Sequence, residues 1–244
     1  MRILIIIPCY NEALSLPTLL EKLRSIPTEH SLDLAVINDC STDDTGKIAS
    51  QMADVAIHLP VNVGIGGAVQ TGLLYAATHG YEAAIQVDGD GQHPPDQIPL
   101  LIQHWMNTKA DVVVGSRFLE KKGFQSSALR RSGIRYLSTW LRLLTGKNIL
   151  DVTSGFRLFG KTALQLAAHD YPDEYPEPEC LILFAHAQLR IEEIPVEMKE
   201  RQGGHSSIRY ITQLYYMAKV TLAMLFTHLK YRHYGPHPTS HHSR

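Results

Sequence analysis

Two aspartates in a glycine-rich turn are the residues whose types and spacing most directly suggest chemistry. Residues 85–95 read IQVDGDGQHPP, and the apolar run at 83–87 leads straight into Asp88 and Asp90. Spaced carboxylates at the end of a buried strand can hold Mg²⁺ or Mn²⁺, which proteins usually bind with one or two carboxylates plus substrate phosphates. Asp-Gly repeats are also common in surface turns, so these residues alone leave a turn and a metal site both open. An EF-hand calcium loop is excluded, because His93 stands where that loop requires glycine.

The elements that must position this turn are short strands that alternate with helical patterns. Apolar, mostly β-branched runs predict strands at residues 3–7, 34–37, 55–59, 83–87 and 111–114. Apolar residues between them recur at helical spacing. This alternation predicts an α/β fold with a mainly parallel, doubly wound, Rossmann-like sheet. A late strand is expected at residues 191–198, where Pro195 indicates a sheet edge.

Polar residues follow the other predicted strands. Glu12 follows the first strand, Asp39 the second, and Gly66 lies in a glycine-rich helix start after the third. Because ligands bind outside the carboxyl ends of strands in open α/β sheets, we expect these residues to converge with Asp88 and Asp90. Asp39 could accept a hydrogen bond from a ribose hydroxyl or a base N–H, or it could cap a helix. The glycine-rich segment is neither a Walker loop nor a good dinucleotide fingerprint, although its helix start could favour an anion.

The composition points to an anionic ligand or surface rather than to nucleic acid. The 244 residues include 23 basic and 24 acidic ones, so bulk nucleic-acid binding is not indicated. Residues 117–147 nevertheless carry a local charge of +7, and residues 199–232 carry +5. Three widely spaced cysteines without a C-x-x-C motif predict a reducing compartment. We expect neither a secretory signal nor a membrane-spanning helix, because the apolar runs are too short.

Seven short motifs, in order along the chain, resemble the family 2 glycosyltransferases and within them the dolichol-phosphate mannose synthase-like branch. The resemblance extends from residue 3 to about residue 207. Each motif is weak alone, but their shared order is specific. They are Pro8-x-Tyr10-Asn11-Glu12, Asn38-Asp39-x-Ser41-x-Asp43-x-Thr45, Asn62-x-Gly64-x-Gly66-x-Ala68, Asp88-x-Asp90-x-Gln92-His93-Pro94-Pro95, Gly115-Ser116-Arg117, Thr153-Ser154-Gly155-Phe156-Arg157 and Arg201-x-x-Gly204-x-Ser206.

The resemblance implies a GT-A fold and an inverting transfer from a nucleotide-activated sugar. By motif position, the residues expected to hold the nucleotide are Pro8, Tyr10, Glu12, Asp39 and Asp88. Asp90 and Gln92 would ligate the Mg²⁺ or Mn²⁺ that bridges the diphosphate. Arg117 and Arg201 would bind phosphate or sugar groups near the reaction centre, which makes them catalytic candidates together with Asp90. The wider set of expected substrate-binding residues includes Gly66, Arg131, Arg135, Arg157 and Glu179. Two positions depart from the branch, because Arg135 stands where serine is common and Ser207 where lysine is often found.

Two acceptor classes place different demands on the protein. A lipid phosphate, with a second pKa near 6, is already largely ionised at neutral pH and needs cations rather than a base. A sugar hydroxyl needs a carboxylate base, for which the candidates are Asp151, Glu177 and Glu179. The density of arginines favours a polyprenyl phosphate over a glycan hydroxyl in cell-surface polysaccharide synthesis. The cationic candidates are Arg117, Arg130, Arg131 and Arg135. A non-catalytic sugar-nucleotide-binding partner of a membrane complex is the third hypothesis.

The predicted organisation is a GT-A domain at residues 1–205, an amphipathic helix at 206–232 and a flexible His-rich tail at 233–244. One face of that helix is apolar, whereas Lys219 near its middle disfavours a membrane span. We expect the helix to lie on a membrane surface or on a small membrane-protein partner, with packing on its own domain as the alternative. The predicted location is cytoplasmic, peripheral on the inner face of the membrane. The residues of the apolar face are Ile208, Ile211, Tyr215, Ala218, Leu222, Leu225 and Leu229.

Overall fold

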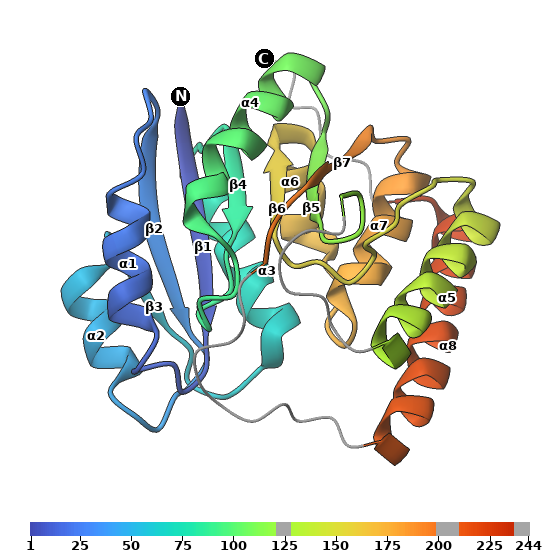
Figure 1. Ribbon diagram of the computed structural model, residues 1–244, viewed down its shortest axis with the longest axis horizontal. Coiled ribbons are helices and arrows are strands. Elements are labelled where there is room, and N and C mark those ends of the chain that lie inside the picture. The colour runs from blue at the N-terminus through green and yellow to red at the C-terminus, as the bar shows by residue number, and fades with distance from the viewer. Residues whose placement is uncertain (121–127, 199–209, 237–244) are drawn as a thin grey trace.

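A computed structural model describes residues 1–120, 128–198 and 210–236, and its centre is a seven-stranded sheet (Figure 1). The strand order is β3-β2-β1-β4-β6-β5-β7, and every neighbouring pair is parallel except those that involve β6. This arrangement confirms the predicted mainly parallel sheet. The strands are β1 (Arg2–Cys9), β2 (Ser31–Asn38), β3 (Val55–His58), β4 (Ala83–Gln86), β5 (Val112–Ser116), β6 (Arg157–Gly160) and β7 (Ile191–Pro195).

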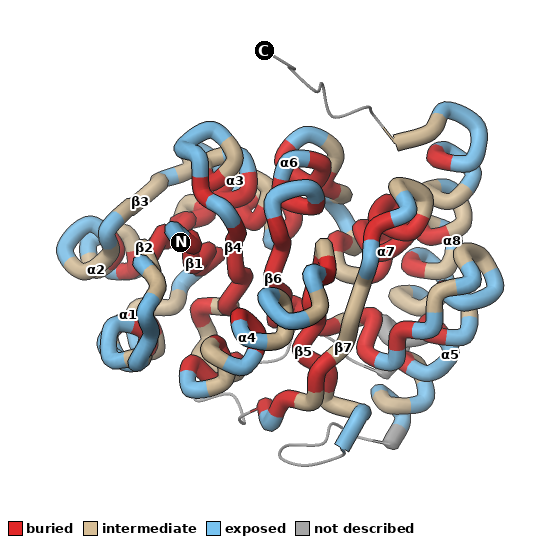
Figure 2. Tube along the Cα trace, turned by 90° about the horizontal axis from the view of Figure 1, so that it is seen from above, coloured by how far each residue is buried: buried red, intermediate tan, exposed pale blue. Residues whose placement is uncertain are grey.

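Helices cover both faces of the sheet, which gives three layers (Figures 1 and 2). Helices α1, α2 and α4 contribute to the core on one face, and α3, α5, α6, α7 and α8 contribute to the core on the other. The helices are α1 (Leu16–Arg24), α2 (Thr45–Met52), α3 (Gly64–Thr78), α4 (Ile98–Thr108), α5 (Ala128–Thr145), α6 (Lys161–Asp170), α7 (Pro176–His186) and α8 (Tyr210–Tyr234). A 3₁₀ turn, η1 (Pro95–Gln97), precedes α4.

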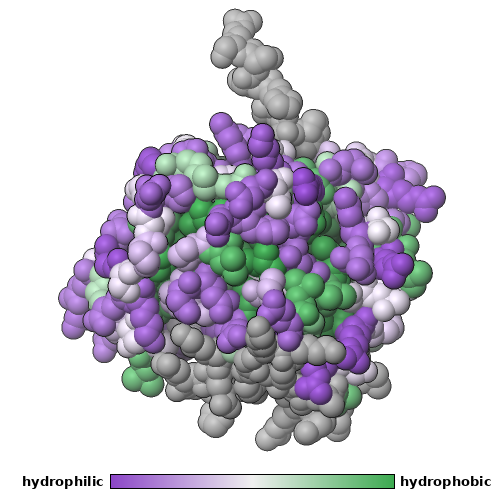
Figure 3. All heavy atoms as spheres, turned by 45° about the horizontal axis from the view of Figure 1, so that its top comes forward, coloured by the Kyte–Doolittle hydropathy of each residue, from purple (hydrophilic) through white to green (hydrophobic). Residues whose placement is uncertain are grey.

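The central strand β1 shows why the sheet needs two helical layers. Its side chains alternate between the faces, so Ile3 and Ile5 join one core while Leu4 and Ile6 join the other, and all four are fully buried. A continuous apolar run is what a strand buried on both faces requires. In Figure 3 the amino-terminal side of the sheet is turned toward the viewer, and hydrophilic side chains surround apolar ones in the middle of that face.

Strand β6 was not predicted, because its four residues are too few to show a period. It inserts antiparallel between β4 and β5, with Gln86 opposite Arg157 on one side and Val114 on the other. The residues that precede it, 151–156, form a turn. The edge position predicted for the last strand is confirmed, since β7 pairs only with β5 among the described strands.

Helix α8 packs on the protein's own domain, but not through the face that the sequence singled out. Val220, Met224 and Tyr231 are buried in the same core as α5 and α7, so the boundary expected at residue 205 does not separate the helix from the main core. The described members of the predicted apolar face include Leu222 and Leu229, and these are exposed. Within the described residues, no helix is both long and apolar enough to cross a bilayer. The predicted tail lies outside them from residue 237 onward.

Candidate functional site

A pocket of about 270 Å³ opens at the carboxyl edge of the sheet, where the turns after β1, β2 and β4 meet. The convergence expected from the strand ends is therefore present for Glu12, Asp39, Asp88 and Asp90. Pro8 and Tyr10, which the family resemblance assigned to the nucleotide, line the same pocket. Gln92 and Gly66 do not line this pocket. The lining residues are Pro8, Cys9, Tyr10, Glu12, Asp39, Ile65, Ala68, Asp88, Gly89 and Asp90.

The turn after β1 is held by side chains from the turn after β2. The backbone N–H of Glu12 donates to Thr45 Oγ1 at 2.8 Å, and that of Ala13 donates to Asp43 Oδ2 at 3.1 Å. Asp44, at the start of α2, makes no capping bond through its side chain. Ser15 Oγ donates to Glu12 Oε2 at 2.9 Å and to the carbonyl oxygen of Gly89 at 2.8 Å. The Glu12 carboxylate is therefore fixed relative to the aspartate turn.

Asp39 caps a helix and lines the pocket at the same time. Its side chain is buried, and its two oxygens accept hydrogen bonds from the backbone N–H groups of Val63 at 2.7 Å and Gly64 at 2.9 Å. The helix start that could have attracted a phosphate thus already holds a carboxylate. Gly66 serves a packing role, because a Cβ there would lie 2.3 Å from the carbonyl oxygen of Asp173.

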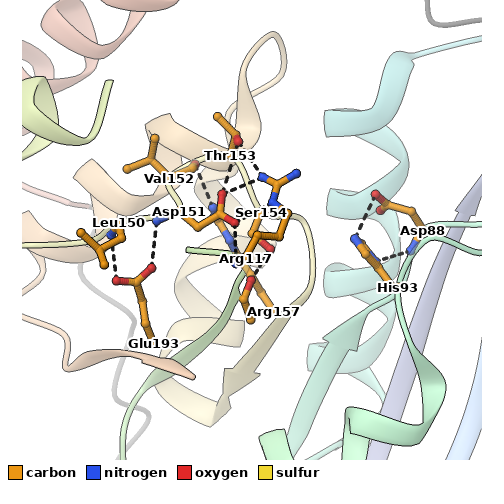
Figure 4. Close-up of polar contacts among 11 residues, drawn as sticks. Asp88, His93, Arg117, Leu150, Asp151, Val152, Thr153, Ser154, Arg157 and Glu193 are labelled. Atoms are coloured by element: carbon orange, nitrogen blue, oxygen red, sulfur yellow. Dashed lines mark hydrogen bonds and ion pairs between the residues drawn. The ribbon is translucent and has the colours of Figure 1, made fainter. Parts of the chain in front are cut away.

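The Asp88 carboxylate is oriented by a buried histidine that sequence reasoning did not assign to the site. The backbone N–H of Asp88 donates to His93 Nδ1 at 2.9 Å, and His93 Nε2 lies 3.5 Å from Asp88 Oδ2 (Figure 4). Because Nδ1 accepts, a neutral His93 carries its proton on Nε2, directed at the carboxylate. The ring is only 4% exposed and packs 5.1 Å from the Phe156 ring. Its place in the D-x-D-x-Q-H-P-P motif was the available signal. Gln86 Nε2 also donates to Asp88, at 3.1 Å.

Asp90 and Gln92 are chemically suited to a divalent ion. Both are half-buried, and the backbone N–H of Gln92 donates to Asp90 Oδ1 at 3.0 Å, which closes the turn. Carboxylate and amide oxygens are the ligands that Mg²⁺ and Mn²⁺ prefer. The described residues contain no cluster of three or more His, Cys, Asp or Glu side chains suited to a metal. That donor set fits an ion completed by substrate phosphates rather than one enclosed in a protein cage.

Arg117 lies across from Asp88 and forms a bidentate ion pair with Asp151 (Figure 4). Its Nε and Nη2 donate to the two oxygens of Asp151, both at 2.7 Å, and its backbone N–H donates to the same carboxylate at 3.0 Å (Figure 4). Asp151 is fully buried. Burial acts to lower the pKa of Arg117, but the hydrogen bonds and charge of Asp151 outweigh it and raise that pKa. Asp151 is therefore engaged as an ion-pair partner and does not stand free as a base.

The turn at residues 151–155 connects the two halves of the site. Arg117 Nη2 donates to Thr153 Oγ1 at 2.9 Å, and a Cβ on Gly155 would lie 3.3 Å from the Asp88 carboxylate oxygens. Glu193 of β7 supports this turn from beneath, since it accepts the backbone N–H groups of Leu150 at 2.8 Å and Asp151 at 2.9 Å. Burial raises the pKa of Glu193. Glu193 could not be assigned to the site from the sequence, because its role depends on β7 lying beside the turn.

Arg157 is buried beneath the site rather than in the pocket. It is 0% exposed, and its guanidinium donates to Cys180 Sγ at 2.8 Å and to the carbonyl oxygen of Val152 at 3.2 Å. Its Nε makes no hydrogen bond to a described residue. The substrate contact expected for Arg157 is not supported, because β6 directs this side chain into the core formed with α7. Its charge reaches Glu177 and helps to keep that carboxyl ionised.

The two glutamates of α7 point to different surroundings. Glu177 interacts electrostatically with Arg157, Asp88 and Arg117, and burial raises its pKa. Glu179 instead accepts a hydrogen bond from Thr227 Oγ1 of α8 at 2.5 Å, and burial raises its pKa as well. The structure therefore brings Glu177 toward the site, whereas the predicted substrate residue Glu179 belongs to the contact between α7 and α8.

The arginines of α5 are divided in a similar way. The pKa of Arg130 is lowered by burial and by the charge of Arg117, so these two cations are neighbours. Arg131 is half-buried on the next position, while Arg135 is exposed on the outer face of the helix. The structure thus does not bring Arg135 to the pocket as expected. Arg201 lies outside the described residues.

Comparisons with known proteins identify the family to which this doubly wound chain belongs. Residues 4–166 match the family described as glycosyl transferase family 2, so the chain belongs to this family. It is similar to the undecaprenyl-phosphate mannosyltransferase of Micrococcus luteus, with 32% identity over 85% of this chain and 88% of that protein. It is also 32% identical to the UDP-N-acetylglucosamine–dolichyl-phosphate N-acetylglucosaminyltransferase of Methanococcus voltae, over 80% and 84% of the two chains.

The fold is shared with solved structures. The glucosyl-3-phosphoglycerate synthase of Mycobacterium tuberculosis, crystallised with Mn²⁺, UDP and glucosyl-3-phosphoglycerate, superimposes with a TM-score of 0.71 at 20% identity. The match covers 93% of this chain and 79% of that one. The expected GT-A fold and membership among the glycosyltransferases are confirmed.

Proposed function

We propose that this protein is an inverting, metal-dependent glycosyltransferase that moves a sugar from a nucleotide-sugar donor to a polyprenyl phosphate. A phosphate oxygen of the acceptor attacks the anomeric carbon, the bond from that carbon to the donor diphosphate breaks, and a nucleoside diphosphate leaves. The names of the two relatives support this acceptor class. The observation that carries the proposal is the turn at 151–155, which contacts the acidic pocket at Asp88 and the cation Arg117 on its other side.

The acidic pocket is the donor site in this proposal. Tyr10 is 51% exposed at its rim, which leaves the ring available to stack on a base. Asp39 and Glu12 offer acceptors for ribose hydroxyls, and Asp88 is held in place by His93 and Gln86. Asp90 and Gln92 would hold Mg²⁺ or Mn²⁺, which when bound neutralises the charge that develops on the leaving diphosphate.

The acceptor side is cationic and needs no base for a phosphate nucleophile. Arg117 and Arg130 are within electrostatic reach of each other, and grouped arginines are typical of sites that recognise phosphate. Asp151 keeps Arg117 in a fixed orientation beside the turn at 151–155, so its positive charge has a defined position relative to an incoming anion. Because polyprenyl phosphates reside in membranes, the protein would work peripherally at the cytoplasmic face of the membrane.

Donor binding and turnover test this proposal together. With Mn²⁺ and the matching nucleotide sugar, we expect a rise in the melting temperature, and transfer to a short-chain polyprenyl phosphate. Asp90→Ala should lower turnover by roughly 10³-fold, because it removes a metal ligand where charge develops. Asp44→Ala is the matched control, since Asp44 is exposed and makes no capping bond. Absence of transfer by the wild type, or equal loss in both variants, would refute the proposal.

A glycan hydroxyl acceptor is the second candidate, and the position of Glu177 favours keeping it. This carboxylate lies within electrostatic reach of Arg117 and Asp88, and burial raises its pKa toward the range useful for a base. It is the one of the three predicted base candidates that is neither in the Arg117 ion pair nor in the α7–α8 contact. Transfer to oligosaccharides rather than to polyprenyl phosphate, abolished by Glu177→Gln, would select this function.

A further inference from the structure

We propose that α5 and α8 together form a docking surface for an anionic lipid bilayer. The surface consists of the outer, solvent-exposed faces of the two helices, and it is distinct from the donor pocket. The inference rests on the proposed function in one respect, since a membrane-borne acceptor gives the docking its purpose. The sequence led us to expect that α8 lies on a membrane surface or on a small membrane-protein partner. The surface proposed here includes a second helix, α5, and its partner is lipid.

The exposed face of α8 is apolar although the helix is already packed on the other side. Val220 and Met224 are fully buried toward the core, whereas Tyr215, Leu222 and Phe226 are 62%, 52% and 64% exposed. Apolar residues on both faces are more than one packing contact requires. Single exposed apolar residues are ordinary, but several on one helical face mark an interaction surface.

The outer face of α5 carries a matching stripe. Leu129, Tyr136 and Leu143 are spaced by seven residues, which places them in one line along the helix, and they are 56%, 50% and 72% exposed. The buried residues of the helix, which include Leu137 and Leu141, lie on its opposite side. Helix α5 therefore repeats the pattern of α8, with a core face and an exposed apolar line.

The two apolar lines belong to one continuous surface. Thr221 Oγ1 of α8 lies 3.3 Å from the hydroxyl oxygen of Tyr136, which is a member of the α5 stripe. Gly133 allows this close approach, because a Cβ there would lie 3.3 Å from Met217 Sδ. Both helices lie at the same outer side of the molecule, and both begin on the side where the parallel strands end (Figures 1 and 2).

The charge of these helices identifies the partner. The 43 residues of α5 and α8 contain seven lysines and arginines and no acidic residue. On α5, Arg135 and Arg142 are also spaced by seven and run beside the apolar stripe, and on α8 the Lys219 ammonium lies 5.2 Å from the ring centroid of Tyr215. Apolar residues flanked by cations match an interfacial membrane contact, in which lysine and arginine meet anionic headgroups.

The same charge argues against a second copy of this chain as the partner. In a two-fold dimer the same surface is used by both subunits, so cations without compensating acids would face each other at the contact. Like charges brought together in this way disfavour association. A bilayer that contains anionic lipids provides the opposite charge and an apolar interior at once.

Docking on this surface would bring the acceptor phosphate to the site. Arg130 stands in the first turn of α5, beside Arg117. Tyr216 in the first half of α8 stacks edge to face on Tyr175, with ring centroids 5.4 Å apart, and lies near Glu177. The ends of α5 and α8 nearest the site are thus also the start of the membrane surface.

Vesicle sedimentation of the full chain tests the proposal. The probes are vesicles of phosphatidylcholine alone and vesicles of phosphatidylcholine with phosphatidylglycerol. The wild type should bind the anionic vesicles and lose that binding as salt shortens the Debye length from about 8 Å toward 3 Å. Leu222→Gln/Phe226→Gln should weaken partitioning by about tenfold or more, because two large apolar side chains no longer enter the bilayer. Arg142→Gln/Leu143→Gln on α5 should weaken it as well.

The matched control is Leu74→Gln/Leu100→Gln, which changes two leucines that are each 43% exposed on α3 and α4. It should bind vesicles as the wild type does. Thermal shift with nucleotide sugar and Mn²⁺ is measured in parallel, so a failed donor site and a failed membrane surface are distinguishable. Wild-type protein that stays in solution with anionic vesicles overturns the proposal. So does an equal loss in the control, or a dimer in light scattering that Leu222→Gln/Phe226→Gln dissociates.

Discussion

The two sides of the site are built in different ways. The proposed donor side comes from short turns that directly follow parallel strands, and its acids are held by nearby polar residues, as Glu12 is by Ser15 and Asp88 is by His93. The acceptor side comes from residues far apart in the sequence, with Arg117 and Asp151 separated by 34 positions. The donor side is an open acidic pocket, whereas the cations of the acceptor side are held by an ion pair and by packing between helices.

Because of this difference, we expect stability and chemistry to be coupled more strongly on the acceptor side than on the donor side. On the donor side, a polar side chain can be changed while the strand that carries it remains packed by its apolar residues. On the acceptor side, the same residues that would touch the substrate also hold the turn at 151–155 in place. Substitutions should therefore separate function from folding on the donor side and combine them on the acceptor side.

The largest effect on stability is expected at the buried ion pair between Arg117 and Asp151. Asp151→Ala leaves the Arg117 guanidinium, whose side chain is 15% exposed, without its carboxylate, and we expect a loss of about 3–5 kcal/mol in the free energy of unfolding. Urea denaturation measures it. The control is Glu192→Ala, which breaks the ion pair with Arg190 at side-chain exposures of 33% and 57% and should cost about 1 kcal/mol or less.

A double substitution sharpens the same test. Arg117→Met/Asp151→Leu replaces both charges by apolar groups and should recover part of the stability, since no buried charge is left unpaired. It should remain inactive, because the cation is gone. Equal costs for Asp151→Ala and Glu192→Ala would contradict the coupling of folding and chemistry on the acceptor side.

The donor side was the more predictable of the two. The rule that strand ends meet at one sheet edge was enough to bring together Glu12, Asp39, Asp88 and Asp90. Even there, the sequence left open whether Asp39 caps a helix. The structure shows that it does, and its partners are the backbone N–H groups 24 and 25 residues away. His93 was present in a recognised motif, yet its contact with Asp88 depends on how the turn closes.

The acceptor side could not be predicted residue by residue. Glu177 and Glu179 differ by two positions, which corresponds to a rotation of about 200° around a helix, so they lie on nearly opposite sides of α7. The sequence does not show which side packs against α8, so it could not decide which glutamate faces the site. Arg157 was expected at the substrate from the family resemblance, but strand β6, which was not predicted, directs it into the core. Arg135 lies on the exposed side of α5, which the helical spacing alone did not reveal. Long-range packing decided each case.

The next test compares these two glutamates on activity. If the acceptor is a phosphate, Glu177→Gln and Glu179→Gln should both retain turnover within about tenfold of the wild type. If it is a hydroxyl, Glu177→Gln should lose about 10²–10⁴-fold while Glu179→Gln does not. The pH profile adds a sign. Because burial raises the pKa of Glu177, a base at this position would be protonated and inactive at low pH, and the rate would rise as pH increases through that pKa.

A smaller effect is expected at His93, which acts on Asp88 by positioning it. His93→Leu removes both contacts and should raise the KM for the donor by about tenfold, in the range found for residues that orient ligating groups. His93→Asn should recover part of this loss, because its side-chain oxygen can accept the Asp88 N–H in place of Nδ1. Steady-state kinetics with varied donor separates KM from kcat. A change in kcat alone, or no recovery by asparagine, would argue against a positioning role.

The smallest effect concerns the contact between α7 and α8. His186 Nε2 and His228 Nδ1 are 3.0 Å apart, and burial is the main cause that lowers the pKa of both, with the charge of nearby Arg232 adding to it. A lowered folded-state pKa means that the unfolded chain binds more protons below about pH 6.5, so this pair loses stability as pH falls. Between pH 7.5 and 5.5, His186→Gln should therefore lose less melting temperature than the wild type, by about 2 °C. The exposed His169→Gln serves as the control, and an identical pH response in all three proteins would show that the pair does not contribute to the docking of α8.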